Sequence, residues 1–140
     1  MTHCRTPKEC ANQARRWPQS EAWLQQGQDL LNQWNDNRGA LRFSDHASED
    51  RMLERAVSQG DIRRALRDGI VIHRDPYEGR EHFLVLAWVP IRKKVWQPLH
   101  IAGYWYRGEV KVITVYDPRT EAWMWTPEFD RRVCWCHSAK

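Results

Sequence analysis

The sequence lacks the features that mark several common classes of protein. No apolar run approaches the roughly 18 to 20 residues that span a membrane, and the first residues lack the apolar core of a secretory signal, so we expect no membrane association and no export. The seven glycines form neither a dinucleotide-binding loop nor a phosphate-binding loop. Asp and Glu are scattered, whereas a two-metal nuclease groups them, and no His-Glu-x-x-His or Gly-x-Ser-x-Gly motif occurs. These absences argue against nucleotide-dependent, two-metal and serine-hydrolase chemistry.

Cysteine is absent from the middle of the chain. Cys4 and Cys10 lie near its start, and Cys134 and Cys136 lie near its end. A secreted disulfide scaffold spreads its cysteines through the domain, so we expect a reducing, cytoplasmic location and no cofactor. An alternative is a zinc site in which these cysteines and His137 join the two termini, although their spacings match no common zinc motif. The other alternative is that the thiols bind nothing.

The chain has enough apolar sequence for one ordinary domain. With 140 residues, 41% of them hydrophobic, it can bury roughly two-thirds of its unfolded surface. The net charge of +4 favours an anionic partner only weakly, because many small basic proteins bind no nucleic acid. The nine tryptophans fill a core, stack on bases or form protein interfaces, and the sequence does not divide them among these uses.

Residues 1–40 are predicted to form a helical extension. Ser20 is a suitable N-cap, and residues 35–39 end the helix. Small and apolar residues recur inside it at helical spacing: Trp23, Gly27, Leu30, Leu31 and Trp34. This stripe is typical of a packing face, which either covers one side of the main domain or binds a partner protein.

The main domain is expected to cover residues 41–126 and to begin with two helices. The first spans about residues 45–57. The second begins at a capping box formed by Ser58 and Asp61, and it ends at Gly69. Its inward-facing residues are predicted to be Ile62, Ala65 and Leu66.

After the second helix, the hydrophobic pattern changes to an alternating one. It predicts four strands, over residues 70–74, 82–89, 99–106 and 110–117. Turn residues separate them at 76–79, 90–98 and 107–108. Connections this short imply an α+β fold, in which two helices pack on one face of a four-stranded antiparallel meander sheet. The remaining residues, 127–140, are expected to form a C-terminal tail.

The register between the last two strands decides which side chains are neighbours. A two-residue loop places His100 and Tyr116 on opposite faces of the sheet. A three-residue loop with a left-handed glycine makes them directly opposed neighbours on one face. The alternative to a site here is that His100, with Tyr104 and Tyr106, lines a solvent-exposed face.

The first predicted helix of the main domain carries one histidine and two arginines. His46 shares an apolar face with Leu53, whereas Arg51 and Arg55 form an i, i+4 pair on roughly the opposite side. A shared phosphate site therefore requires this helix to lie at the rim of a cleft. The alternative is that both arginines pair with neighbouring acidic residues on a solvated face.

Several short motifs resemble a family of small, uncharacterised bacterial domains. In chain order they are Ser44-x-His46-Ala47, Arg51-Met52-x-x-Arg55, Asp61-Ile62, Ala65-Leu66 with its Gly69 ending, Val112-Ile113-Thr114-Val115-Tyr116, and Trp123. The resemblance covers residues 41–123. Members are often encoded beside zinc-finger antitoxins of the YgiT type, and the family is similar to the RelE, barnase and colicin group of toxin ribonucleases.

The resemblance implies a twisted antiparallel sheet with helices on one side. It also implies metal-independent cleavage of RNA, free or on the ribosome, by attack of a ribose 2′-hydroxyl on the adjacent phosphate, under the control of an antitoxin or other protein partner. The implied proton carriers, phosphate clamps and phosphate-orienting hydroxyls are, respectively, His46 and His100, Arg51 and Arg55, and Thr114 and Tyr116. Two alternatives are a catalytically inactive protein-binding module of the same fold and a regulator that binds nucleic acid without cutting it.

Overall fold

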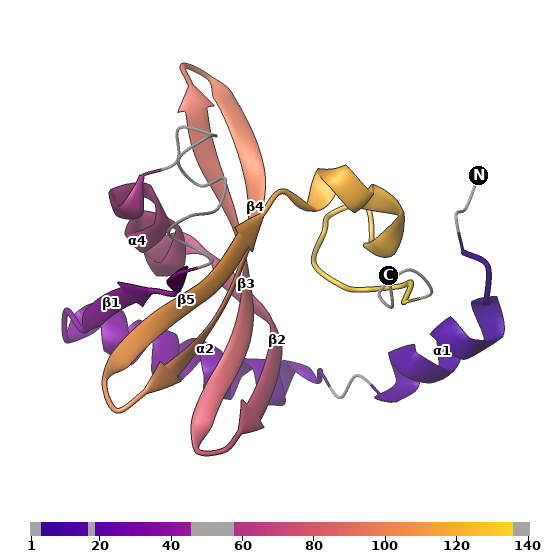
Figure 1. Cartoon of the computed structure of the whole chain (residues 1–140), viewed down its shortest axis with the longest axis horizontal. Coiled ribbons are helices and arrows are strands. Elements are labelled where there is room, and N and C mark those ends of the chain that lie inside the picture. The colour runs from indigo at the N-terminus through magenta and orange to yellow at the C-terminus, as the bar shows by residue number, and fades with distance from the viewer. Residues whose placement is uncertain (1–3, 17–18, 46–57, 136–140) are drawn as a thin grey trace.

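The computed structural model describes residues 4–16, 19–45 and 58–135 (Figure 1). Its elements are, in chain order, α1 (Pro7–Arg16), α2 (Glu21–Asp36), β1 (Ala40–Phe43), α4 (Gln59–Asp68), β2 (Ile70–Tyr77), β3 (Arg80–Arg92), β4 (Val95–Tyr106), β5 (Glu109–Tyr116) and the 3-10 helix η1 (Pro118–Met124). Within these ranges, no helix combines the length and the hydropathy needed to cross a membrane. The helix predicted over residues 45–57, with His46, Arg51 and Arg55, lies outside the described residues apart from its first position.

The α+β class is confirmed, but the sheet differs from the prediction. It has five strands in the order β1-β5-β4-β3-β2, and the four predicted strands form the expected antiparallel meander. The additional strand, β1, pairs with β5 in parallel, so the prediction of four strands, all antiparallel, is wrong. The four residues of β1 are too few to show an alternating pattern, which explains why the sequence did not reveal it.

The predicted break over residues 90–98 is also wrong. β3 and β4 continue through most of it as a hairpin that turns at Lys93 and Lys94. β2 pairs with β3 only as far as Leu86, so the hairpin extends beyond the rest of the sheet as a two-stranded ribbon (Figure 1). Pro90 and Pro98 fit in this ribbon because strands with an open edge tolerate a missing N–H.

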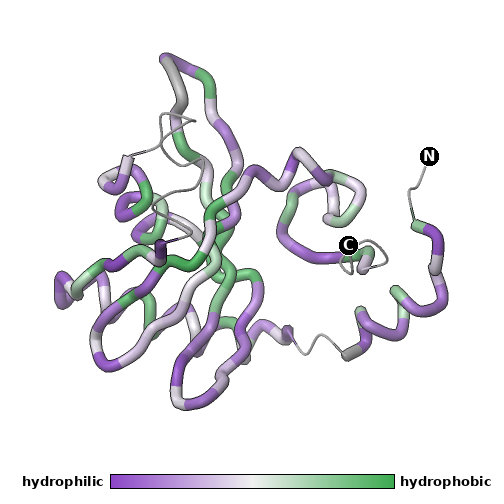
Figure 2. Tube along the Cα trace, in the orientation of Figure 1, coloured by the Kyte–Doolittle hydropathy of each residue, from purple (hydrophilic) through white to green (hydrophobic). Residues whose placement is uncertain are grey.

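One face of the sheet is covered by α2 and α4. Ser20 caps α2 as predicted, and the buried residues of this helix lie on the predicted stripe. Leu31 and Trp34 are each only 1% exposed and join the core formed by the strands. The stripe on α2 therefore covers the main domain. Hydrophobic residues accordingly concentrate along the central strands in Figure 2.

A buried ion pair also fixes α2 to the sheet. Arg74 of β2 is 7% exposed and pairs with Glu81 of β3 at 2.8 Å. Its guanidinium also donates to the Gln26 side chain at 2.9 Å and lies 4.1 Å from the centroid of the Trp23 ring. Both contacts come from α2, so this helix helps to compensate for the cost of burying the Arg74 charge.

The local features predicted for α4 are confirmed. Ser58 and Asp61 form a reciprocal capping box, and Gly69 stands at the C-cap. The side chains buried against the sheet are the predicted ones: Ile62, Ala65 and Leu66.

The C-terminal segment, residues 118–135, covers part of the other face. Its Met124 and Trp125 form a second hydrophobic cluster with Ile72 and Leu86. Figure 1 shows this segment on the side of the sheet away from α4. The rest of this face stays open, and that open area holds the candidate site.

Candidate functional site

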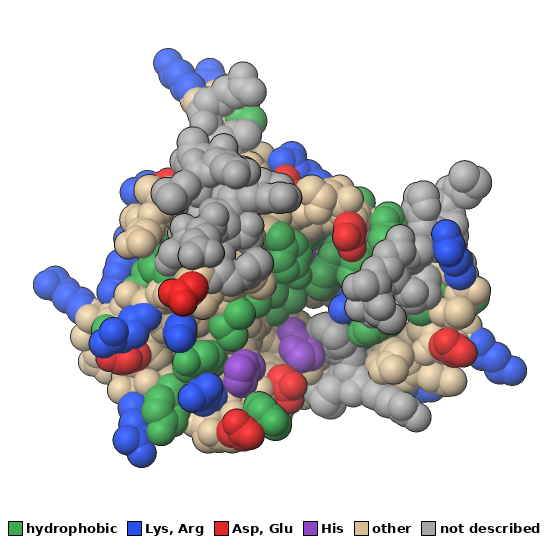
Figure 3. Space-filling model, viewed as in Figure 1, with side chains coloured by type: hydrophobic (Ala, Val, Ile, Leu, Met, Phe, Trp, Pro, Cys, Tyr) green, Lys and Arg blue, Asp and Glu red, His purple; other side chains and the backbone are tan. Residues whose placement is uncertain are grey.

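A row of polar side chains crosses the open face of the sheet. Asp75 is paired with His82, His82 with Tyr104, Tyr104 with Lys111, and Lys111 with Arg42, so the row spans all five strands. Directly paired residues project from the same face of a sheet. All five are exposed or partly exposed. We call these five residues the cross-strand row. Figure 3 shows histidine side chains gathered beside acidic and basic ones on this side of the molecule.

The cross-strand row borders a shallow hollow of about 290 Å³. The hollow is lined by His73, Asp75, Tyr77, His82, Phe83, Leu84, Ala102, Gly103 and Ile113. It thus brings two imidazoles and a carboxylate together from neighbouring strands.

Aromatic rings flank the imidazole of His82, and a guanidinium lies over one of them. Its ring centroid lies 6.2 Å from that of Tyr77 and 5.3 Å from that of Tyr104. The Arg80 guanidinium lies 4.9 Å from the centre of the Tyr104 ring and 5.8 Å from that of Tyr106. Flat rings with a cation above them form a surface on which bases stack and to which phosphates are attracted.

The second imidazole of the hollow is held neutral. Burial lowers the pKa of His73 to about 4, and the nearby Asp75 carboxylate offsets only part of this effect. At pH 7 His73 is therefore a neutral group that accepts or donates a hydrogen bond but carries no charge.

His100 and Tyr116 are direct neighbours, which is one of the two predicted arrangements. The prediction required a three-residue loop for this pairing, whereas the structure produces it with a two-residue loop and a bulge. The loop has two residues, Arg107 and Gly108, both with positive φ, as in the tight turn that joins twisted strands. The register then shifts by one residue beside Gly103, through a bulge at Ile113. Beyond the bulge, His100 faces Tyr116.

His100 is fully buried, so the alternative that it lines a solvent-exposed face is wrong. Its Nδ1 lies 3.1 Å from the Tyr116 hydroxyl, and its Nε2 lies 2.7 Å from the Phe129 carbonyl oxygen. A carbonyl only accepts, so Nε2 carries the proton and Nδ1 accepts from the phenol. The Trp125 ring packs edge-on, 4.3 Å away between centroids. This geometry favours a structural role for His100 over the proton transfer expected from the sequence.

The other predicted site residues fall in different places. Thr114 pairs with Ala102, which lines the hollow, and it is partly exposed. Tyr116 is partly buried under the C-terminal segment, and burial raises the pKa of its hydroxyl, which keeps the phenol protonated. The structure thus brings His100 and Tyr116 together, and it places Thr114 near the hollow.

Acidification should destabilise the protein through His100. Burial lowers its pKa in the folded state to about 4, below the value of about 6.5 in an unfolded chain, so the unfolded state binds more protons between these two values. The contribution of His100 to the free energy of unfolding is therefore fully present above about pH 6.5. It falls by about 3 kcal/mol as the pH drops towards 4. Urea unfolding at pH 7, 6, 5 and 4.5 measures the loss.

The control for this prediction is His100→Gln, which retains a hydrogen-bonding side chain but does not titrate. Carboxylates contribute equally to both proteins, so the difference between the two pH profiles isolates the histidine. Parallel profiles would contradict the assignment of a neutral, buried His100.

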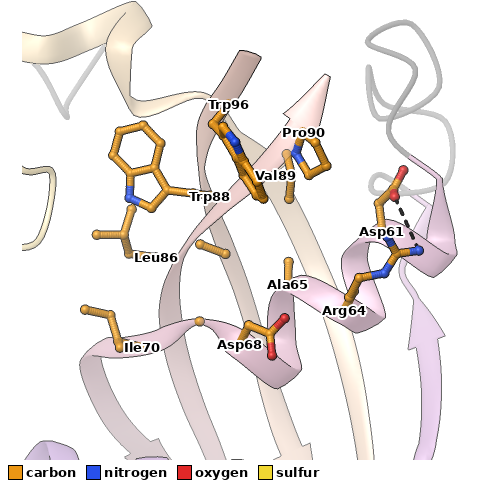
Figure 4. A pocket seen from close by; sticks show the side chains of 12 residues that line it. Asp61, Arg64, Ala65, Asp68, Ile70, Leu86, Trp88, Val89, Pro90 and Trp96 are labelled. Atoms are coloured by element: carbon orange, nitrogen blue, oxygen red, sulfur yellow. Dashed lines mark ion pairs between the residues drawn. The ribbon is translucent and has the colours of Figure 1, made fainter. Parts of the chain in front are cut away.

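An apolar pocket lies between α4 and the extended ribbon (Figure 4). It has a volume of about 330 Å³, and Trp88, Trp96, Leu86 and Ile70 form much of its wall. Trp88 and Trp96 remain 51% and 57% exposed. Large exposed aromatics beside an apolar hollow are typical of a surface that binds protein.

Fold and site together define an α+β domain whose sheet is covered by helices on one face and carries a polar hollow on the other. Within the chain, residues 43–117 match the family described as "Domain of unknown function (DUF4258)", and the chain belongs to that family. No curated protein and no solved structure matches the chain. The family match includes every residue of the cross-strand row except Arg42. The predicted link from this family to toxin ribonucleases and their antitoxins stays a prediction.

Proposed function

We propose that this protein is a toxin-like, metal-independent endoribonuclease that binds RNA across the open face of its sheet. The observation that carries the proposal is the cross-strand row, which aligns an imidazole, a phenol, an ammonium and a guanidinium. Cleavage by a ribose 2′-hydroxyl requires proton carriers and fixed cations, and these groups supply both.

Binding of the RNA backbone falls to the cations of this face. Lys111 on β5 and Arg42 on the edge strand β1 form one end of the row, and Arg80 lies over the tyrosines. Arg42 pairs with Glu109 at 3.0 Å, but both side chains are well exposed, so a phosphate can compete for the guanidinium. Tyr77 and Tyr104 offer rings for base stacking.

Proton transfer in this proposal falls to His82. It is partly exposed on the open face and directly opposite Asp75, a carboxylate that can orient its ring. Imidazole is suited to the task because it both takes and gives a proton near neutral pH. Thr114, on the neighbouring part of the face, offers a hydroxyl to the phosphate.

His46, Arg51 and Arg55 remain part of the proposal as the second proton carrier and the phosphate clamps. A described residue just before their segment supports this: the Ser44 hydroxyl donates to the Ile113 carbonyl at 2.9 Å, next to Thr114 and at the border of the hollow. The chain therefore leaves the sheet beside the proposed site.

A second candidate function, binding of a partner protein, is favoured by the apolar pocket beside Trp88 and Trp96. A catalytically inactive member of the family would use the pocket as its main site. A toxin-like ribonuclease would use it to bind an antitoxin in the cytoplasm. The pocket contributes to no step of RNA cleavage in this proposal.

The proposal is tested by incubating the purified protein with total RNA in the presence of EDTA and identifying the 3′ ends of the products. We expect fragments that end in a 2′,3′-cyclic phosphate, because the 2′-hydroxyl is the nucleophile. His46→Ala/Arg55→Ala should produce none. Arg67→Ala, at an exposed ion pair on α4, should cleave as the native protein does.

Ribosome-bound RNA is tested in parallel with free RNA, since a toxin of this type can require the ribosome. Intact RNA in both preparations would overturn the ribonuclease proposal. If the protein then still bound RNA with a strong dependence on salt, it would be a nucleic-acid-binding regulator. If it bound none, the protein-binding module would be the remaining function.

A further inference from the structure

Three thiols from opposite ends of the chain converge at the C-terminal segment. The Sγ atoms of Cys4, Cys10 and Cys134 all lie within 4.8 Å of one another, and those of Cys10 and Cys134 are 3.9 Å apart. Tetrahedral zinc with Zn–S bonds of about 2.3 Å separates its sulfur ligands by about 3.8 Å. A disulfide needs about 2.05 Å and joins only two of the three sulfurs. The spacing therefore fits thiolates around one small ion.

The position of α1 gives an independent reason for a bond at this point. α1 carries mostly hydrophilic residues (Figure 2), and among those whose side chains the structure describes only Cys10 is buried. A polar helix of ten residues is marginally stable by itself, and this one has no large apolar side chain with which to pack. What encloses Cys10 is the far end of the chain, including Cys134 and Trp135.

Two hydrogen-bonding groups lie at the Cys10 sulfur. The Trp135 backbone N–H donates to Cys10 Sγ at 3.3 Å, and the Thr6 hydroxyl lies 3.7 Å from the same sulfur. Backbone N–H groups that point at sulfur are the contacts that orient and stabilise metal-bound thiolates.

A half-buried arginine supplies the compensating charge. Arg132 donates from Nε to the Cys134 carbonyl at 2.9 Å, while its Nη2 is buried and has no hydrogen-bond partner among the described residues. Three thiolates around a divalent ion carry a net charge of minus one, which a guanidinium at this place offsets.

We propose that Cys4, Cys10 and Cys134 bind a zinc ion that fastens α1 to the C-terminal segment. Three soft sulfur ligands select zinc over calcium or magnesium, which prefer oxygen. This site is independent of the proposed ribonuclease function, and it uses no residue of the cross-strand row.

The test is the zinc content of the full-length chain, purified under reducing conditions without chelator from cells supplied with zinc. We expect about one zinc per native chain by mass spectrometry of the metal. In titrations against a competing zinc dye, Cys4→Ser, Cys10→Ser and Cys134→Ser should each lower the affinity by at least about tenfold. Val133→Ser, which introduces the same residue next to Cys134, should leave it unchanged.

Hydrogen exchange provides the second measurement. Removal of zinc should abolish protection of the α1 amides and leave the amides of β3 and β4 protected, which also shows that each variant is folded. The proposal would be overturned if reduced native protein bound no zinc, or if all three serine variants retained it. A Cys10–Cys134 disulfide in protein kept under reducing conditions would overturn it as well.

Discussion

His82→Ala should lower the rate of RNA cleavage by about 10²–10⁴-fold, the usual contribution of a single proton carrier. The reason lies in the position of the imidazole. His82 is partly exposed on the open face, opposite Asp75 and beside Tyr104, and no other described histidine combines exposure with a place in the cross-strand row. Single-turnover cleavage of a labelled RNA, under the conditions that give cyclic-phosphate products, measures the effect.

RNA affinity separates a chemical role for His82 from a binding role. The alanine variant should bind RNA within a few-fold of the native protein, because the cations of the row stay in place. Lys111→Ala should show the reverse pattern, with weaker binding and a smaller salt dependence. Equal cleavage rates for native and His82→Ala protein would remove this histidine from the mechanism.

The parts of the fold that the sequence predicted well are those set by local chemistry. Ser20, and the pair Ser58 and Asp61, cap the helices at which they were placed, because capping depends only on residues three or four positions apart. β1 depends instead on a parallel pairing with β5, nearly seventy positions away, and a segment of four residues contains no sign of it. The prediction that Pro90 and Pro98 mark a break between strands was wrong for a related reason. Proline is excluded only from strands that are paired on both edges, and the ribbon has open edges.

The candidate site was harder to predict than the fold. His82 was placed at the start of a strand, but no short motif contains it, because the cross-strand row is assembled by the registers of five strands. The pairing of Tyr104 with Lys111 follows from the two-residue turn at Arg107 and Gly108, which was one of two predicted alternatives, and the pairing of Lys111 with Arg42 requires β1, which was not predicted.

The burial of His100 could not be predicted, because the segment that buries it has no hydrophobic periodicity. Its neighbours in the fold, Trp125 and Phe129, belong to a segment with no regular hydrophobic pattern, so nothing in the sequence placed them over the sheet. The same segment divides this face into two parts. Where it covers the sheet, the histidine is a neutral structural group. Where it stops, the histidines of the hollow remain available to a ligand.

Trp34→Ala should destabilise the protein by about 3–5 kcal/mol, a large share of the stability of a small domain. The ring is 1% exposed, its Nε1 donates to the Ala40 carbonyl at 2.9 Å, and the Arg63 guanidinium lies 4.7 Å from its centroid. Gly39 lies directly against the ring, so Gly39→Ala should destabilise through the same contact, because its Cβ would overlap Trp34. Urea denaturation at pH 7 measures both effects.

Trp96→Ala is the matched control, since it removes the same side chain from a position that is 57% exposed, and its effect should stay within about 0.5 kcal/mol. The contrast decides whether α2 is an appendage or part of the domain. A helix that merely accompanied the domain would lose Trp34 at little cost, and residues 40–135 would then fold alone. A large loss of unfolding free energy in Trp34→Ala would mean that the matched segment, residues 43–117, depends on a helix that precedes it. The reason is that Trp34 packs in the core with residues of β1 and β5.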